Sequence, residues 1–405
     1  MTAHNVQRQD QDAIAAMKPV ADLASRVEAV AKIAAAEAAS VDREARFPTA
    51  AIKAARESRL LGLAVPREFG GEALALTDIA DACYRLGQAC AATGMVFAMH
   101  HSAAACVVRH AGASAWHKDL IRRIAEEQLL FASSTTEGQN GGNVRASAAP
   151  IEGNGADITL TRAATVISYG AEADVIATTA RRADDAPSSD QVLATFVKSD
   201  YVLEPLSGWN ALGMRGAASA GFMLKACGKR EQIVPEPYER IHAQTMQPVS
   251  HLLWASVWAG IAADAVARAQ GFIRKAARQS GGTLPPGAAH FTKARSTLQT
   301  LRGLVASSLA RFEAIADDRA ALASLDFQTA ITLTKVDASE LAVATVLSAM
   351  RASGLAGYRN DGEFTLGRHL RDILSAPIMI NNDRILANVS MSALMSGIPT
   401  SLRSE

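Results

Sequence analysis

The sequence lacks several features that define whole classes of protein. Its four cysteines, Cys83, Cys90, Cys106 and Cys227, form neither a CxxC pair nor the dense spacing of a secreted disulfide framework. Lys plus Arg total 41 and Asp plus Glu total 40, so the formal net charge of +1 provides no global field to attract a polyanion. We therefore expect a reducing, cytoplasmic location, no metal site and no nucleic-acid partner.

Export and membrane signals are also missing. The first residues, MTAHNVQRQDQDAIAAM, place two acids before any apolar stretch and do not follow the order of a signal peptide. Two uncharged runs, 86–108 and 241–263, reach the roughly 20 residues that span a bilayer. Both contain glutamine and histidine, which are rare inside membranes. Buried core helices are the better interpretation, so we expect no membrane span.

What is present indicates a large globular chain. Its 405 residues are enough for two or three compact units. The composition, with 49% hydrophobic but only 5% aromatic residues, is typical of close-packed helices. The alanine-rich segments at both ends have helical periodicity, whereas the middle has short Thr, Val and Ile-rich runs separated by turn residues. The sequence predicts an α+β protein with a helical domain at 1–128, a small antiparallel β-domain at 129–241 and a helical bundle at 242–405.

One polar segment resembles a known cofactor loop. Residues 135–143, TTEGQNGGN, are similar to the flavin loop of acyl-CoA dehydrogenases, with Thr136, Glu137 and Gly141 in agreement. Such a loop offers backbone amides and a hydroxyl to the flavin ring, and glycine allows the main chain to come close. A polar turn between a helix and a strand is the simpler alternative for this segment alone.

Further matches follow in the same order. Residues 166–168 resemble a strand that packs on the flavin, with Val166 in place of tryptophan, and residues 212–216, LGMRG, give the best local match. Residues 354–358, followed by Arg368 and Arg371, resemble a glycine turn that approaches the adenosine half of the cofactor across a subunit boundary. Together these segments indicate a divergent member of the acyl-CoA dehydrogenase superfamily.

The resemblance implies a cofactor, partners and site residues. The cofactor is FAD, with FMN the less favoured choice, and the chain is expected to form a homodimer or homotetramer. The substrate is an acyl-CoA or a related small molecule, and an electron-transfer protein or flavin reductase is the redox partner. The implied cofactor residues are Thr135, Thr136, Gly141, Gly142, Val166, Ser168, Arg351, Leu355, Asn382 and Arg384.

The catalytic carboxylate of that family is missing from its usual position. Counted without gaps from Arg371, the family's glutamate falls on Ile380, which cannot accept a proton. The alternative base position of some members falls near Ser250, followed by His251. Asp383 is the nearest acid and is the candidate catalytic residue, and a solvated or helix-capping aspartate is the simpler interpretation.

Histidines are further candidates for proton transfer. His100 and His101 lie on the apolar segment of the first domain, and an imidazole can donate, accept or titrate near neutral pH. Core histidines with satisfied hydrogen bonds are the simpler interpretation.

The sequence favours the first of three functions, and the other two remain as alternatives. The first is an FAD-dependent acyl-CoA dehydrogenase, which removes a proton from an acyl thioester and sends a hydride to flavin N5. The second is a two-component flavin-dependent monooxygenase of the same fold, which needs no carboxylate base but needs a polar group near the flavin, such as His100, His101 or Ser168. The third is a non-catalytic subunit that completes the cofactor site of another chain.

Overall fold

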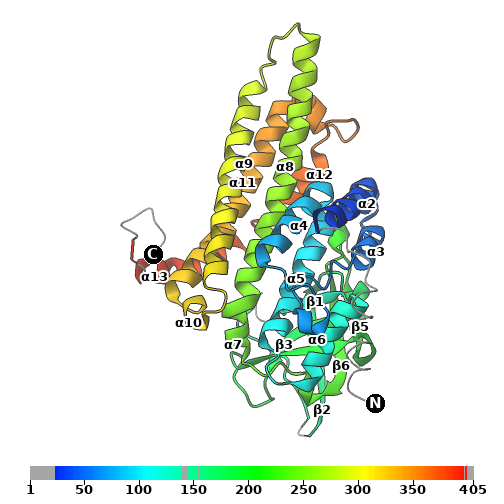
Figure 1. Ribbon diagram of the computed structural model, residues 1–405, viewed down its shortest axis with the longest axis vertical. Helices are drawn as coiled ribbons and strands as arrows, with labels where there is room; N and C mark the ends of the chain where they lie inside the picture. Colours follow the sequence, from blue (N-terminus) through cyan, green and yellow to red (C-terminus); the bar gives the residue numbers. More distant parts are fainter. Residues whose placement is uncertain (1–22, 139–143, 154, 396, 399–405) are drawn as a thin grey trace, which may run out of the picture.

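The computed structural model describes residues 23–138, 144–153, 155–395 and 397–398. The first part of the chain is helical (Figure 1), as predicted. Its helices are α2 Leu23–Glu44, α3 Thr49–Glu57, α4 Leu76–Ala89, α5 Ala91–His110 and α6 Ala115–Glu127.

Two helices carry the long apolar runs. Ala91–His110 and Tyr238–Gln279 are long and apolar enough to cross a membrane by length and composition, yet 89% of the most apolar window of each is buried inside the protein. Burial of that extent is typical of core helices. Small residues allow close contact, since a Cβ at Gly260 would lie 2.2 Å from Tyr84 O and one at Gly87 would lie 2.6 Å from Val257 O. Helices α4 and α8 therefore meet backbone to backbone.

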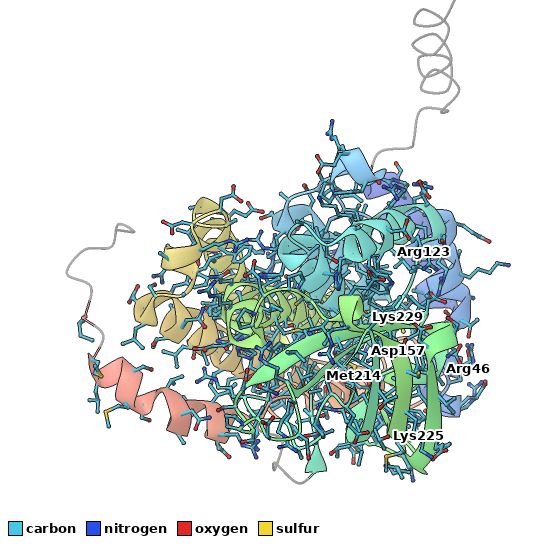
Figure 2. The ribbon with its side chains drawn as sticks, turned by 90° about the horizontal axis from the view of Figure 1, so that it is seen from below. Arg46, Arg123, Asp157, Met214, Lys225 and Lys229 are labelled. Carbon is cyan, nitrogen blue, oxygen red and sulfur yellow. The ribbon has the colours of Figure 1, made fainter. Side chains whose placement is uncertain are left out.

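The middle of the chain forms two three-stranded sheets. The strands are β1 Phe131–Ser134, β2 Asp157–Ile167, β3 Val175–Arg181, β4 Gln191–Val197, β5 Tyr201–Ser207 and β6 Ala220–Lys229. Their orders are β1-β3-β4 and β2-β6-β5. Exposed and buried residues alternate along β2, as expected for a strand with one solvated face. Exposed ion pairs join Lys225 to Glu204 and Lys229 to Asp157 on the second sheet, and Figure 2 labels Lys225, Lys229 and Asp157.

The pairing differs in one respect from the predicted antiparallel sheet. Strands β1 and β3 are parallel, with Phe131 opposite Val175. A parallel pair requires a crossover connection of a dozen or more residues, and the segment that contains β2 provides it. The other pairs are antiparallel, so the predicted sheet type holds for most of this region.

The elements after β6 are helices, and the longest of them extend side by side beyond the rest of the molecule (Figure 1). They are α7 Tyr238–Ile241, the π-helical turn η7 His242–Met246, α8 Gln247–Gln279, α9 Ala288–Ala314, α10 Arg319–Leu322, α11 Leu325–Tyr358, α12 Gly367–Ile373 and α13 Asn382–Met395. The predicted α+β order of helices, sheets and helices is confirmed.

A polar junction joins the helical and sheet regions. Met214 N donates to Asp372 Oδ1 at 2.7 Å, and Arg371 Nη1 donates to Asp42 Oδ1 at 2.8 Å. Arg215 Nε donates to the carbonyl of Asp42 at 2.7 Å. The LGMRG segment and the segment around Arg371 therefore contact each other, and their residues act in this junction as structural contacts.

Candidate functional site

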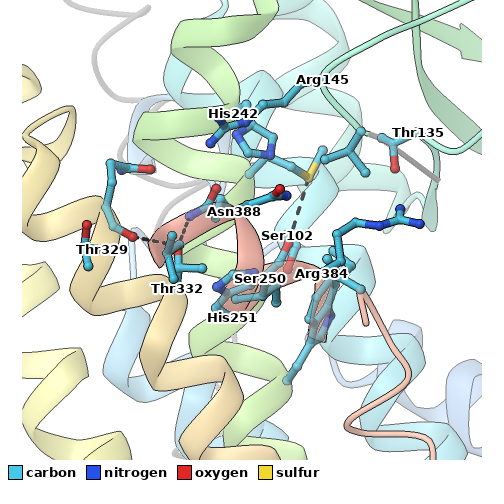
Figure 3. Close-up of a pocket in the computed structure, with 18 of the residues that line it drawn as sticks. Ser102, Thr135, Arg145, His242, Ser250, His251, Thr329, Thr332, Arg384 and Asn388 are labelled. Atoms are coloured by element: carbon cyan, nitrogen blue, oxygen red, sulfur yellow. Dashed lines mark hydrogen bonds between the residues drawn. The ribbon is translucent and has the colours of Figure 1, made fainter. Parts of the chain in front are cut away.

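A cavity of about 310 Å³ lies where the sheets meet the terminal helices. Its walls come from α5, the end of β1 and the loop after it, η7 and α8, the start of α11, and α13 (Figure 3). Among the residues that line it are Met99, Ser102, Ser133, Thr135, Arg145, His242, Met246, His251, Trp254, Thr329, Ile380, Arg384 and Asn388. No Asp or Glu from the described part of the chain lines this cavity, so its only formally charged side chains are the two arginines.

The predicted flavin loop forms one wall. Thr135 lines the cavity, and Thr136 is half-buried beside it. A β-bridge between Glu137 and Ala164 holds the loop against the end of β2. Gly141 and Gly142 lie outside the described residues.

Buried charges fix this loop. Glu137 is 4% exposed and accepts hydrogen bonds from Ala148 N at 2.5 Å and Ala149 N at 3.3 Å. Its Oε1 lies 3.4 Å from Nη1 of Arg162, which is fully buried. Burial lowers the pKa of Arg162 to about 10, and the charge of Glu137 opposes that shift. This pair ties the loop to the space between the two sheets.

The strand residues lie just beyond the loop. A β-bulge interrupts the pairing of β2 between Ala164 and Ile167, and Val166 and Ser168 are both half-buried. Ser168 Oγ and Ser219 Oγ share a hydrogen bond of 2.8 Å. Ser219 lies three residues beyond the LGMRG segment, so this contact joins that segment to the end of β2 next to the loop. Neither Val166 nor Ser168 lines the cavity itself.

The remaining implied cofactor residues are separated. Arg351 is exposed and stands nineteen residues beyond Thr332 on α11, which is about 28 Å along a helix. Leu355 is 71% exposed and follows a break in the helix at Gly354, where φ is +53°. Arg384 lines the cavity. Within one copy of the chain, therefore, Arg351 and Leu355 do not meet the flavin loop.

Asn382 is occupied by contacts within the protein. Its Nδ2 donates to Ser339 Oγ at 2.9 Å and to Glu340 Oε1 at 2.8 Å. Its Oδ1 accepts from Lys335 Nζ at 2.7 Å, and the same ammonium lies 3.3 Å from the carbonyl of Ile380. Burial lowers the pKa of Lys335 to about 8. These bonds anchor the segment that precedes α13.

The base position holds an apolar residue in the folded protein too. Ile380 lines the cavity with φ at +47°, a left-handed conformation that is unusual for a β-branched residue. Asp383 is exposed and is not among the lining residues. Ser250 and His251, at the alternative base position, do line the cavity.

His100 and His101 are buried within the first helical region. His100 Nε2 donates to the carbonyl of Leu61 at 2.8 Å, and its Nδ1 accepts from Phe131 N at 3.0 Å. His101 Nε2 donates to the carbonyl of Leu60 at 3.0 Å. Burial lowers the pKa of His100 to about 4 and that of His101 well below its usual range. Both rings make backbone contacts, and neither lines the cavity.

Two other histidines face the cavity. His251 Nδ1 donates to the carbonyl of Ile331 at 3.2 Å, and burial lowers its pKa to about 4. His242 was not anticipated from the sequence. It lies on the π-helical turn η7, and burial together with the nearby charge of Arg145 lowers its pKa to about 3. Both imidazoles are therefore neutral at physiological pH.

The cavity fits a planar heterocycle that carries hydrogen-bonding atoms. Trp254 Nε1 and Thr329 Oγ1 are buried, and neither has a hydrogen-bond partner in the segments that the structure describes. The hydroxyl of Thr135 stands on the opposite side, between the sheet and these helices. Apolar walls with a few unsatisfied polar atoms are typical of cofactor sites, so the residues present suit a flavin ring.

Comparisons with known proteins agree with this arrangement. Residues 21–128 match the family described as acyl-CoA dehydrogenase, N-terminal domain, and residues 252–380 match acyl-CoA dehydrogenase, C-terminal domain. The chain is 30% identical over 135 residues to L-prolyl-[peptidyl-carrier protein] dehydrogenase of Pseudomonas fluorescens, which is 28% of this chain and 36% of that protein.

Two other relatives show a wider range of activity. The mitochondrial short-chain specific acyl-CoA dehydrogenase of Mus musculus is 25% identical over 49% of each chain. A dibenzothiophene monooxygenase of Rhodococcus erythropolis is 24% identical over 60% of each chain. These matches span between about a third and three fifths of the relatives' lengths.

Solved structures show the same fold. A KijD3 in complex with dTDP has a TM-score of 0.81 at 21% identity, covering 92% of this chain and 96% of that one. FMN-bound TdsC from Paenibacillus sp. A11-2 has a TM-score of 0.81 at 19% identity, covering 93% and 98%. With the two family matches and the predicted motifs in order along the fold, the chain belongs to the acyl-CoA dehydrogenase superfamily of flavoproteins.

Proposed function

We propose that this chain is the oxygenase component of a two-component flavin-dependent monooxygenase. The observation that carries the proposal is the absence of any carboxylate from the described lining of the cavity, with Ile380 at the position of the family's base. When bound, a reduced flavin would supply the two electrons that, with two protons, allow one oxygen atom of O₂ to enter the substrate and the other to leave as water. A separate reductase supplies the reduced flavin, which is FMN or FAD.

The lining of the cavity supports a small, largely apolar substrate. Trp254, Met99, Met246 and Ile380 give it an apolar surface, while apart from the two arginines the polar groups of the lining are hydroxyls, amides and neutral imidazoles. Such groups bind and orient a neutral molecule without removing a proton from carbon. A dibenzothiophene monooxygenase of Rhodococcus qingshengii matches 76% of this chain at 24% identity, and TdsC has been solved with FMN and indole.

The proposed flavin contacts follow from the resemblance. Thr135, Thr136, Gly141 and Gly142 would hold the ring from the loop, with Val166 and Ser168 from the adjacent strand and Arg384 from α13. Arg351 and Leu355 would reach the cofactor of a neighbouring copy in a homodimer or homotetramer. Asn382 would act indirectly, because its amide is already bonded to Lys335, Ser339 and Glu340.

An FAD-dependent acyl-CoA dehydrogenase is the second candidate. It is favoured by the matches to acyl-CoA dehydrogenases and by the arginines of the lining, which suit an anionic thioester substrate. It requires a base for the proton next to the thioester. Asp383 is exposed and outside the lining, and a neutral His251 is the alternative. We therefore rank this function below the monooxygenase, which reverses the order favoured by the sequence motifs alone.

The experiment that separates the candidates uses the purified full chain with FMN or FAD. In one arm, reduced flavin, ¹⁸O₂ and indole or dibenzothiophene are mixed, and the product is analysed by mass spectrometry. We expect tighter binding of reduced than of oxidised flavin and the gain of one ¹⁸O atom. In the other arm, a short-chain acyl-CoA is added to the oxidised protein without air. Bleaching of the flavin in that arm, without ¹⁸O incorporation in the first, would establish the dehydrogenase instead. Activity in neither arm would favour the non-catalytic subunit.

A further inference from the structure

The π-helical turn η7 presents one histidine to the cavity. The turn runs from His242 to Met246 between α7 and α8. His242 and Met246 line the cavity, and Figure 3 shows the ring of His242 close to Arg145. π-helical turns are rare and are often found at functional sites. A π-helical turn contains one more residue than an α-helical turn. That extra residue rotates the side chains of the turn relative to the helix that follows, so it sets the direction in which His242 points relative to α8.

Contacts on the other side hold this turn in place. Gln328 Nε2 from α11 donates to the carbonyl of Ala243 at 2.8 Å. His110 Nε2 at the end of α5 and Thr245 Oγ1 share a hydrogen bond of 2.8 Å, and both residues are buried. The turn is therefore fixed from two helices that lie far apart in the sequence.

His242 differs from the other histidines in this region. The ring nitrogens of His242 make no hydrogen bond to any residue that the structure describes. His100 uses both nitrogens, and His101 and His251 each use one, in bonds to backbone groups. A neutral imidazole has one donor and one acceptor. Because His242 is half-buried and lines the cavity, its two ring nitrogens are available to a bound molecule.

We infer that His242 is the residue that hydrogen-bonds the polar group of the substrate, and that the π-helical turn holds it there. The substrate class that fits is a small apolar molecule with one hydrogen-bonding heteroatom, such as a ring nitrogen, ring sulfur or hydroxyl. This inference rests on the proposed monooxygenase function for the reaction, but the contact itself is independent of it. The imidazole of His242 is neutral when it orients the substrate, and it does not remove a proton from the substrate.

Two kinds of measurement test this contact. The first is modification of the ligand-free protein by diethyl pyrocarbonate, located by mass spectrometry, since this reagent attacks unbonded nitrogens of neutral imidazoles. We expect His242 to react faster than His100, His101 and His251, and to be protected by indole. The second is kcat/KM for indole. His242→Leu is expected to lower it by about 100-fold, as for loss of one positioned hydrogen-bond donor. His242→Gln, which keeps a donor and an acceptor, is expected to stay within about tenfold of wild type.

A matched pair of threonine variants tests the turn. Thr245→Val removes the hydroxyl that bonds His110 with almost no change in shape, and we expect slower modification of His242 and a lower kcat/KM. Thr345→Val removes an equally buried hydroxyl that bonds Thr297 in the terminal bundle, and we expect no change in either readout. Equal effects of the two variants would overturn the role of the turn.

The outcomes separate this inference from the function. If wild type and His242→Leu incorporate ¹⁸O equally well, His242 does not bind the substrate, while the proposed monooxygenase function is supported. If wild type incorporates none, yet indole protects His242 from modification, the contact stands and the function is wrong. An unreactive His242 in the ligand-free chain overturns the inference by itself.

Discussion

The buried pair of Glu137 and Arg162 gives the most demanding test of how the loop is held. The charges lie 3.4 Å apart with exposed fractions of 4% and 0%. At an effective dielectric constant of about 20, their attraction is about 5 kcal/mol. Desolvation offsets most of this in the folded protein, but removal of one partner leaves the other charge buried alone, at a cost of about 3–5 kcal/mol.

Glu137→Gln is therefore expected to lower the free energy of unfolding by about 3–5 kcal/mol. The amide oxygen can still accept one of the two bonds from Ala148 N and Ala149 N, so most of the loss comes from Arg162, whose buried charge keeps only neutral partners in Thr179 and Ser147. Arg162→Met leaves the carboxylate with its backbone donors and is expected to cost less. The double variant is expected to lose at least about 1 kcal/mol less than the two single losses added together.

The assay is urea unfolding followed by circular dichroism, with wild type, the three variants and the control at the same pH and salt concentration. Lys229→Met, which breaks the exposed pair with Asp157, is the control and should leave the unfolding midpoint unchanged. A midpoint for Glu137→Gln equal to that of wild type would refute the reasoning. So would losses in the double variant that equal the sum of the single losses.

Two more predictions concern the junction between the sheet region and α12. Burial raises the pKa of Asp372 to about 6, so the folded state keeps a proton that the unfolded chain has lost above about pH 4. The free energy of unfolding of wild type, relative to that of Asp372→Asn, should therefore fall by about 3 kcal/mol as the pH rises from about 4 to beyond 6. A difference between the two proteins that stays the same at these pH values in urea unfolding would contradict this. Gly213→Ala would place a Cβ 2.0 Å from the carbonyl oxygen of Arg371, and we expect a loss of about 1–3 kcal/mol in the same assay. The control is Gly303→Ala, in the middle of a helix, where the added Cβ would have no atom within 4 Å; it should stabilise the protein by about 0.5–1 kcal/mol. Equal effects of the two substitutions would count against close packing at Gly213.

The order of helices, sheets and helices was readable from the sequence because it depends on local periodicity. The start of α4 at Leu76 and the change to strands after α6 follow directly from such patterns. The parallel pairing of β1 with β3 was not readable, since strand partners depend on the path of the whole chain. The loop at Thr135 lies beside the end of β2, where Glu137 bridges Ala164, and the role of these residues in cofactor binding stays a prediction.

The candidate site was predicted only in part, for identifiable physical reasons. Counting from Arg371 placed Ile380 at the base position, and its side chain does line the cavity. The same counting could not reveal that Asn382 is bonded to Lys335, because that contact joins residues 47 positions apart. His242 was missed because a π-helical turn adds a residue that the 3.6-residue period does not show.

The junction around Asp42 and Asp372 has a consequence for how the protein opens. Helix α2, the LGMRG segment and α12 are joined there by an ion pair and by hydrogen bonds to backbone groups. If any one of the three segments moves away, the groups that it contacted on the other two become exposed to solvent. Amide protons in these three segments should therefore exchange with solvent at a common free energy of opening, as one cooperative unit. These three segments, which are distant in sequence, would then open together. The amide protons at the outer end of the long bundle would exchange separately, with their own free energy of opening.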